Sequence, residues 1–162
     1  MKSKKVWMYL LVALLFSACA GKHYSKQESA YIVFKTPTVK HADMGFIYAS
    51  KEDIKIELYS AGQPVMALEV SPSSVCMSLF ECMDKSAFNT AVLSHNYPAD
   101  ILDRIFRAEA IMGGKNKQMV RNGFTQKISQ TNKYEIIYTV LNNQTIFRDT
   151  INNIVIKIKR LK

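Results

Sequence analysis

The sequence has few histidines, few cysteines and no long hydrophobic run. Its histidines, His23, His41 and His95, are scattered without the paired spacing typical of a metal site, so no metal or other cofactor is expected. The apolar stretch at residues 6–16 would cover only half of a roughly 30 Å hydrocarbon core, which argues against a stable transmembrane helix. No nucleophile, base and orienting group stand at a recognisable spacing, so the sequence predicts no enzyme.

The length and the apolar content favour one folded domain. A chain of 162 residues is enough for a single domain and too short for two cores of ordinary size. Hydrophobic residues make up 48% of the chain and aromatic residues 10%, which excludes a disordered tail protein.

The first residues have the plan of a secretory signal peptide. Three lysines precede the uncharged residues 6–16, and Ser17-Ala18 then place two small residues before Cys19. One interpretation is an ordinary signal peptide cut near Ala18, with Cys19 incidental.

The alternative is a lipid attachment signal. Phe16-Ser17-Ala18-Cys19 resembles the bacterial lipoprotein motif, although that family usually has leucine where Phe16 stands. The resemblance implies that Cys19 receives a diacylglycerol and becomes the first mature residue, so that the chain is held on a membrane by its acyl chains. Ala20, rather than aspartate, implies an outer-membrane lipoprotein facing the periplasm, with the inner membrane as the alternative.

The mature domain is basic. Removing residues 1–18 takes away three lysines and no acid, which leaves 19 basic and 13 acidic residues. An exported domain does not meet nucleic acid, so no nucleic-acid partner is expected. The densest basic run, Lys157, Lys159 and Arg160, alternates with isoleucine, which indicates a solvated strand face or attraction to anionic head groups.

The other two cysteines, Cys76 and Cys82, form a natural pair. When Cys19 carries the lipid, two cysteines are left in the chain. An exported chain meets an oxidising compartment, so these two cysteines are expected to form one disulfide. Residues six apart on a helix rise about 9 Å, beyond the roughly 7 Å Cα limit for a bridge. If the bond forms, residues 76–82 are therefore not one continuous helix. Five intervening residues do not suit a redox pair.

Hydrophobic periodicity predicts strands, then helices, then strands. Period-two alternation or β-prone composition marks eight candidate strands. They are residues 31–34, 45–48, 54–59, 64–70, 124–128, 134–140, 145–150 and 154–159. Between the fourth and fifth, Asp84 predicts the cap of a helix through Phe88 and Val92. Pro98 predicts the start of a second helix, which Gly113-Gly114 ends.

This order predicts an α+β fold with a signal peptide at residues 1–18, a tether at 19–30 and one β-rich domain at 31–162. The expected architecture is an antiparallel, open, barrel-like sheet, or half-barrel, of about seven or eight strands with two inserted helices.

The order of elements resembles the lipoprotein receptor LolB and the carrier LolA. The segments that carry the resemblance are Gly45-Phe46-Ile47, Leu58–Gly62, Pro98–Arg107, Phe124–Tyr138 and Ile154–Ile158. The mature chain is short for the receptor, and tryptophan is absent after Trp7, whereas the receptor's strands often contain it. The resemblance implies an apolar cavity for acyl chains, with acylated lipoproteins or a periplasmic carrier as partners.

Two functions remain open at this point. In the first, the domain binds acyl chains of other lipoproteins for outer-membrane localisation. In the second, it is a structural or interaction lipoprotein of an envelope assembly, without a ligand cavity. The same apolar strand face would either line the cavity or pack against the helices. The candidate residues are Ile54, Ile56, Leu58, Met66 and Leu68.

Overall fold

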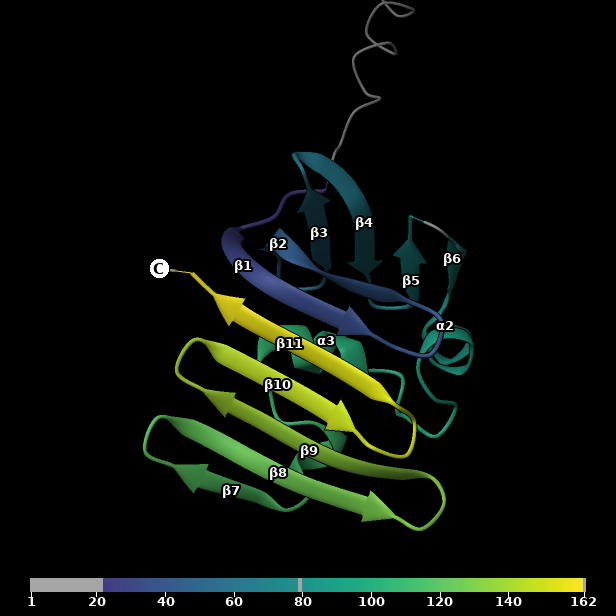
Figure 1. The fold of residues 1–162 in the computed structure, drawn as a ribbon, viewed down its shortest axis with the longest axis vertical. Coiled ribbons are helices and arrows are strands. Elements are labelled where there is room, and N and C mark those ends of the chain that lie inside the picture. The colour runs from purple at the N-terminus through teal and green to yellow at the C-terminus, as the bar shows by residue number, and fades with distance from the viewer. Residues whose placement is uncertain (1–21, 79, 162) are drawn as a thin grey trace, which may run out of the picture.

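Alternating apolar residues build most of the chain into one antiparallel sheet. The computed structural model describes residues 22–78 and 80–161, so the signal segment and Cys19 lie outside the described residues. Among these residues, eleven strands form one sheet (Figure 1). The strands are β1 (Lys26–Lys35), β2 (Lys40–Ala49), β3 (Ile54–Ser60), β4 (Gln63–Val70), β5 (Ser74–Met77), β6 (Phe80–Asp84), β7 (Lys117–Val120), β8 (Gly123–Gln130), β9 (Tyr134–Leu141), β10 (Gln144–Asp149) and β11 (Ile154–Arg160).

The two ends of the described chain meet in the middle of the sheet. The strand order is β6-β5-β4-β3-β2-β1-β11-β10-β9-β8-β7. β1 pairs with β2 on one side and with β11 on the other, with Ile32 opposite Asp43 and Ile158. Each half of the sheet is therefore a simple meander, and the β1–β11 ladder joins the halves.

The expectation of a half-barrel with about seven or eight strands is wrong. The structure has eleven strands in one sheet whose edge strands, β6 and β7, do not pair with each other. The eight expected strands all occur, and the three additional ones are β5, β6 and β7. These have only four or five residues each, too few for an alternating pattern to stand out in the sequence.

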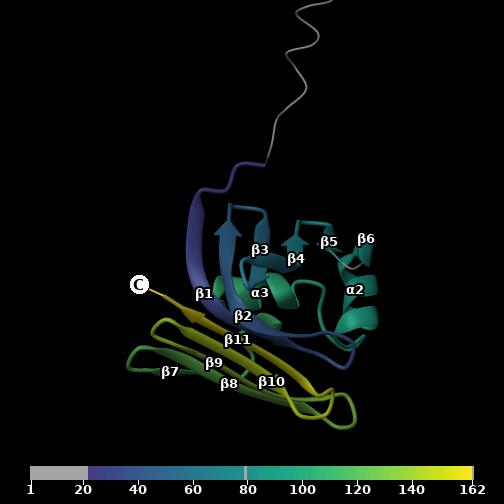
Figure 2. The same cartoon turned by 45° about the horizontal axis from the view of Figure 1, so that its top comes forward.

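The sheet is curved, and its inner side faces the helices. In Figure 2 the β7–β11 half lies below, and the β1–β6 half curves upward so that α3 lies between the two halves. Two α-helices, α2 (Lys85–Val92) and α3 (Ile101–Arg107), and a 3-10 turn, η1 (Met112–Gly114), are formed by the described residues. None of these helices has the length and apolar character needed to cross a bilayer.

The helices form largely where the periodicity predicts them. Asp84 caps α2 by accepting a hydrogen bond from the Ala87 amide at 2.8 Å, and Phe88 and Val92 are buried. α3 is shorter than expected. It begins at Ile101 rather than Pro98, and it ends where Ala108 adopts a left-handed conformation, before the glycines.

The start of the domain also differs from the expected boundary. β1 begins at Lys26, so residues 26–30, expected in the tether, belong to the sheet. Their apolar content is too low for the alternation to mark them, and pairing with the end of β2 brings them into the ladder.

One apolar core lies between the sheet and the helices. Inward-facing residues of most strands contact the apolar faces of α2 and α3 in a single buried cluster. The largest fully buried side chains include Phe34, Phe88, Phe106, Phe147 and Tyr138. The packing of two short helices against a curved sheet thus determines which side chains lie inside.

Candidate functional site

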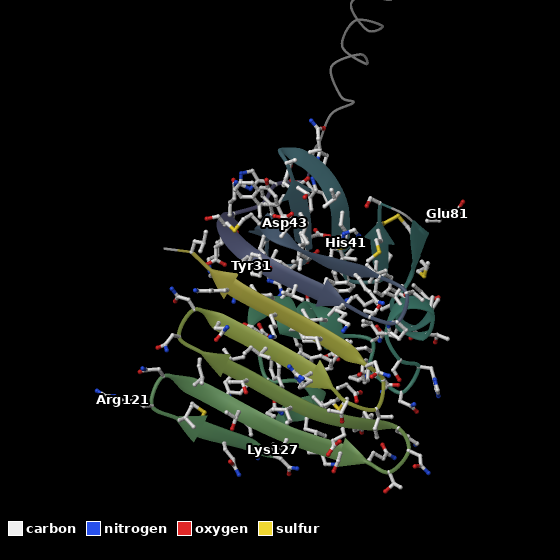
Figure 3. The ribbon with its side chains drawn as sticks, viewed as in Figure 1. Tyr31, His41, Asp43, Glu81, Arg121 and Lys127 are labelled. Carbon is white, nitrogen blue, oxygen red and sulfur yellow. A yellow bond between two sulfur atoms is a disulfide. The ribbon has the colours of Figure 1, made fainter. Side chains whose placement is uncertain are left out.

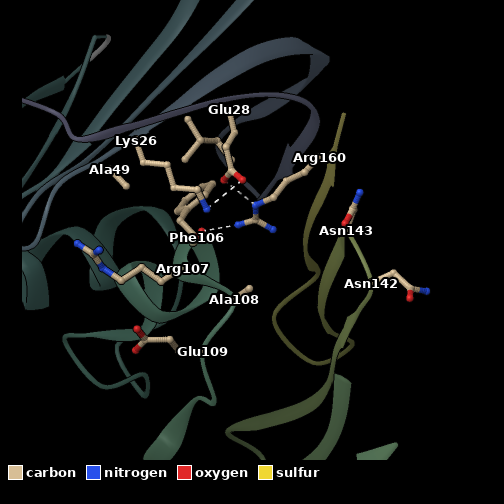
Figure 4. A pocket seen from close by; sticks show the side chains of 11 residues that line it. Lys26, Glu28, Ala49, Phe106, Arg107, Ala108, Glu109, Asn142, Asn143 and Arg160 are labelled. Carbon is tan, nitrogen blue, oxygen red and sulfur yellow. Dashed lines mark hydrogen bonds and ion pairs between the residues drawn. The ribbon is translucent and has the colours of Figure 1, made fainter. Parts of the chain in front are cut away.

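A pocket of about 450 Å³ lies at the C-terminal end of α3 (Figure 4). We call it the α3 pocket. It is bounded by the end of α3, the first residues of β1, the end of β2, the β9–β10 turn and the end of β11. Its charged lining residues are Lys26, Glu28, Arg107, Glu109 and Arg160.

Arg160 joins three elements around this pocket. Its Nε donates to Glu28 Oε2 of β1 at 3.1 Å, and its Nη1 donates to Thr145 Oγ1 of β10 at 3.2 Å. Its Nη2 donates to the Phe106 carbonyl oxygen at 2.7 Å, near the end of α3. Carbonyls in the last turn of a helix have no intrahelical donor, so a guanidinium is a suitable partner for one of them.

Arg107 holds the same end of α3 to the opposite half of the sheet. Its Nη1 donates to the Ser50 carbonyl oxygen at 2.9 Å, in the turn between β2 and β3. Its Nε donates to Asp103 at 3.1 Å, one turn back on α3. Two arginines therefore connect the end of α3 to the sheet through polar contacts, whereas the rest of the helix is held by apolar packing.

The Glu28 carboxyl in the pocket is ionised at neutral pH. Partial burial would raise the pKa of Glu28, but the hydrogen bond from Lys26 and the charge of Arg160 outweigh it, so this pKa lies below its usual range. Lys26 Nζ lies 3.0 Å from Glu28 Oε1. The charges on this side of the pocket are thus already paired within the protein.

The five candidate cavity residues lie together on the inner face of β3 and β4. Each is at most 1% exposed, and each belongs to the cluster that includes Phe88 of α2 and Ile105 of α3. They are Ile54, Ile56, Leu58, Met66 and Leu68. The structure brings them together in the core, while the α3 pocket lies on another part of the inner side.

Arg160 is a site residue that the sequence does not mark. The basic run of Lys157, Lys159 and Arg160 predicts a solvated face or one attracted to anionic head groups, but the Arg160 side chain is only 14% exposed. The alternation of β11 contains the signal that was missed. Ile154, Ile156 and Ile158 point inward, so Arg160, two residues further along, shares their face.

Cys76 and Cys82 lie on the neighbouring strands β5 and β6 and are joined in a disulfide (Figure 3). Their Cα atoms are 4.0 Å apart. The segment between them is a strand hairpin, so the geometric condition derived from the spacing is met. The bond closes the outer hairpin of the sheet next to its β6 edge.

Loss of this disulfide should destabilise the domain modestly. Closing a loop of about seven residues contributes roughly 2–2.5 kcal/mol on the loop-entropy description, so the double variant Cys76→Ser/Cys82→Ser should lose about that much free energy of unfolding. Urea unfolding measures the loss, with Ser73→Ala in the adjacent turn as the control. Mass spectrometry of unreduced wild-type protein should show one internal bridge, and two free thiols would contradict the assignment.

The first described residues are held against the sheet. Lys22 Nζ lies 3.0 Å from Asp53 Oδ1 and donates to Ser71 Oγ at 2.9 Å, and it also contacts Glu69. The hydrogen bond to Glu69 is the main cause that raises the pKa of Lys22 above its ordinary value. Cys19, the predicted lipidation residue, is three positions before this contact.

The arrangement of the α3 pocket suits binding. Among the described residues, no three histidine, cysteine, aspartate or glutamate side chains gather as a metal-binding group. The pocket instead combines paired charges with the apolar side chains of Ile47 and Phe106.

The sequence matches no protein-family model and no curated protein.

Proposed function

We propose that this chain is an envelope lipoprotein, anchored through Cys19 at the periplasmic face of the outer membrane, that binds acyl chains of other lipoproteins. The proposal is supported by how little secondary structure packs against the inner face of the sheet. An apolar layer contributed by most of the strands is covered by only two short helices, and α3 has seven residues. A ligand that buries the same apolar surface of the sheet can displace a helix of this length.

The free energy that α3 gains by burying its apolar side chains is comparable to the free energy that an acyl chain would gain on burial. α3 buries four apolar side chains, Ile101, Leu102, Ile105 and Phe106. At about 1.5–3 kcal/mol for each buried side chain, this face contributes about 6–12 kcal/mol. An acyl chain of about fifteen methylenes gains roughly 12 kcal/mol on burial. An acyl chain that displaces α3 from the sheet therefore restores most of the apolar burial that the displacement removes.

The polar contacts at the end of α3 make such a displacement local. Arg160 and Arg107 hold the helix end by donating hydrogen bonds to the backbone carbonyl oxygens of Phe106 and Ser50, each contributing about 1.5–3 kcal/mol at most. The sheet ladders do not depend on these contacts. We expect α3 to move while the sheet keeps its pairing.

The direct test uses acylation-deficient protein. The Cys19→Ser variant is incubated with an acylated lipoprotein released from membranes, and with the same lipoprotein made without its acyl groups. The proposal predicts a soluble complex with the first client only. If that complex does not form, and a fluorescent fatty acid also fails to bind, the proposal is wrong.

An internal reporter makes the test site-specific. Because Trp7 is the only tryptophan and lies in the signal segment, the mature domain is free of this fluorophore. A Phe106→Trp variant would place one reporter at the α3 pocket, and a Tyr31→Trp variant would place one on the exposed face of β1. Acyl binding should change the emission of the first and leave the second unchanged.

A second candidate function is an interaction lipoprotein of an envelope assembly. The filled inner layer favours it, since Phe34, Phe88, Phe106 and Phe147 are fully buried there. In that case the domain binds neither the acylated client nor the fatty acid, and the tryptophan emission of the Phe106→Trp variant does not change when they are added.

A further inference from the structure

Aromatic side chains cross the outer face of the sheet, which is the side away from the helices. Tyr31 of β1, Met44 of β2 and Tyr59 of β3 stand opposite one another in the register. Tyr31 and Met44 are 43% and 42% exposed (Figure 3). The Phe46 ring of β2 continues the group, with its centroid 5.9 Å from that of Tyr59 and 6.2 Å from that of Tyr48. We call these five residues the outer patch, and contiguous exposed apolar side chains of this kind mark an interaction surface.

The first described residues lie on this same face. The Tyr24 ring packs against Tyr48 of the outer patch, with the centroids 5.9 Å apart. Lys22 contacts Glu69, an outward-facing residue of β4. A lipid on Cys19, three positions before Lys22, would thus be attached at the outer face, within about 11 Å of this contact.

Unpaired lysines lie beside the outer patch. Lys159 of β11 stands opposite Tyr31, and Lys157 is two residues away on the same face. Neither lysine forms an ion pair with another described residue. Glu57 of β3, in contrast, is paired with Lys55 at 2.6 Å. The uncompensated charge beside the outer patch is therefore positive.

The surface of an anionic bilayer fits both properties of this face. Tyrosine is enriched at membrane–water interfaces, because its ring is apolar and its hydroxyl can stay hydrated. Anionic lipids attract lysines that lie close to the membrane surface. A second copy of this chain is a poorer partner, because docking through this face would bring two unpaired basic surfaces together.

We propose that the outer patch rests on a bilayer that contains anionic phospholipid, with its aromatic rings among the head groups and with Lys157 and Lys159 beside the anionic groups. This inference rests on the anchor at Cys19 in the proposed function, and it does not depend on the binding of acyl chains. The anchor holds the domain near the bilayer, and the outer patch determines which side of the domain faces the lipid. The inner side, with α3, then faces the periplasm.

The first test uses unacylated Cys19→Ser protein, so its result does not depend on lipid attachment. Sedimentation measures its affinity for phosphatidylcholine vesicles with and without phosphatidylglycerol. We expect binding to the anionic vesicles only, and we expect Lys157→Gln/Lys159→Gln to weaken it about ten- to thirtyfold, since each lysine near an anionic surface contributes about fivefold. This binding is far weaker than that of acyl chains, so the unacylated protein still leaves washed membranes.

The control pair is Lys115→Gln/Lys133→Gln, which removes the same charge from exposed positions outside the outer face. It should weaken vesicle binding less than about threefold, because lysines distant from the bilayer are screened. Equal losses for the two pairs overturn the inference, because the attraction would then follow net charge alone. Absence of wild-type binding to the anionic vesicles also overturns it.

The second test uses acylated protein reconstituted into anionic vesicles that contain brominated phospholipid, which quenches tryptophan on contact. Trp7 lies in the signal segment, so a single reporter can be introduced into the mature domain. We expect the emission of Tyr31→Trp to be quenched and that of Met119→Trp, at the 71% exposed position on the β7 edge, to be unchanged.

Two results of the second test overturn the inference while leaving the anchor intact. One is equal emission from the two reporters, which shows that the anchored domain has no preferred face toward the lipid. The other is a dimer that Tyr31→Lys dissociates, because a second copy would then cover the outer patch. If Cys19 carries no lipid, the anchored position in the proposed function is wrong, and the vesicle affinities of the unacylated protein still decide whether the outer patch binds a bilayer.

Discussion

Replacing Cys19 with serine should transfer the protein from the membrane fraction to the soluble fraction. A serine cannot take the thioether-linked diacylglycerol, so the anchor would be lost. Each acyl chain of about fifteen methylenes contributes roughly 12 kcal/mol to membrane binding, which makes the expected change nearly complete. Immunoblots of washed membranes and supernatants measure it, and mass spectrometry of the mature amino terminus identifies the modification.

The matched control removes the other two thiols. The Cys76→Ser/Cys82→Ser variant lacks the disulfide but keeps Cys19, so it should remain in the membrane fraction. Unchanged retention of the Cys19→Ser protein, or a wild-type chain that begins with an unmodified residue, would contradict lipid attachment.

A lipid on Cys19 would hold the domain close to the bilayer. Lys22 is bound to Asp53 and Ser71, at the turns that join β2 to β3 and β4 to β5. Three residues span at most about 11 Å when fully extended. The anchor and the folded domain are thus separated by a short segment, and these two turns would lie on the membrane-proximal side.

Replacing Gly123 with alanine should destabilise the domain severely. Gly123 begins β8 opposite Leu141, with a φ of 154°. A Cβ atom there would clash with the Val140 carbonyl oxygen and lie 2.9 Å from its carbonyl carbon. Relief requires the backbones of β8 and β9 to separate, so we expect a loss of at least about 3 kcal/mol in the free energy of unfolding. Urea denaturation measures it.

Gly114 is the matched control for this substitution. It also has a positive φ, of 79°, but a Cβ atom there meets nothing within 4 Å. The Gly114→Ala variant should therefore lose only about 1 kcal/mol, the cost of the left-handed conformation. Equal losses for the two variants would show that close approach of the strands is not what requires glycine at position 123.

Local patterns predicted the long elements of this fold. The alternation of Ile54, Ile56 and Leu58, and that of Ile154, Ile156 and Ile158, correctly separates the inner face from the outer face. The apolar stripe of Ile101, Ile105 and Phe106 likewise marks the buried side of α3. These predictions succeed because burial follows a period of two in strands and of about 3.6 in helices, whatever the partner is.

The short elements could not be found in this way. β5 and β7 have four residues each, and all four residues of β7 are exposed. Such strands form because a neighbouring strand has backbone groups free to pair with them, as β8 does for β7. The sequence therefore predicts too few strands, and the half-barrel of seven or eight strands is wrong for this reason.

The candidate site depends on contacts between distant parts of the chain. Arg160 and Glu28 are 132 positions apart, and they meet because β1 pairs with β11. Asn143 and Phe106 enter the same pocket from a turn and a helix whose proximity no local pattern indicates. The pocket therefore became visible only with the sheet order.

Local patterns were enough to predict which residues alternate into the interior, that Asp84 caps a helix and that a second helix follows it, although not the bounds of that second helix. The strand order, the three short strands and the charged pocket at the end of α3 became known with the fold. The difference lies in how far apart in the sequence the interacting residues are. Periodicity and capping act between residues a few positions apart, whereas strand pairing and pocket formation depend on which distant segments meet, and that is set by the packing of the whole chain.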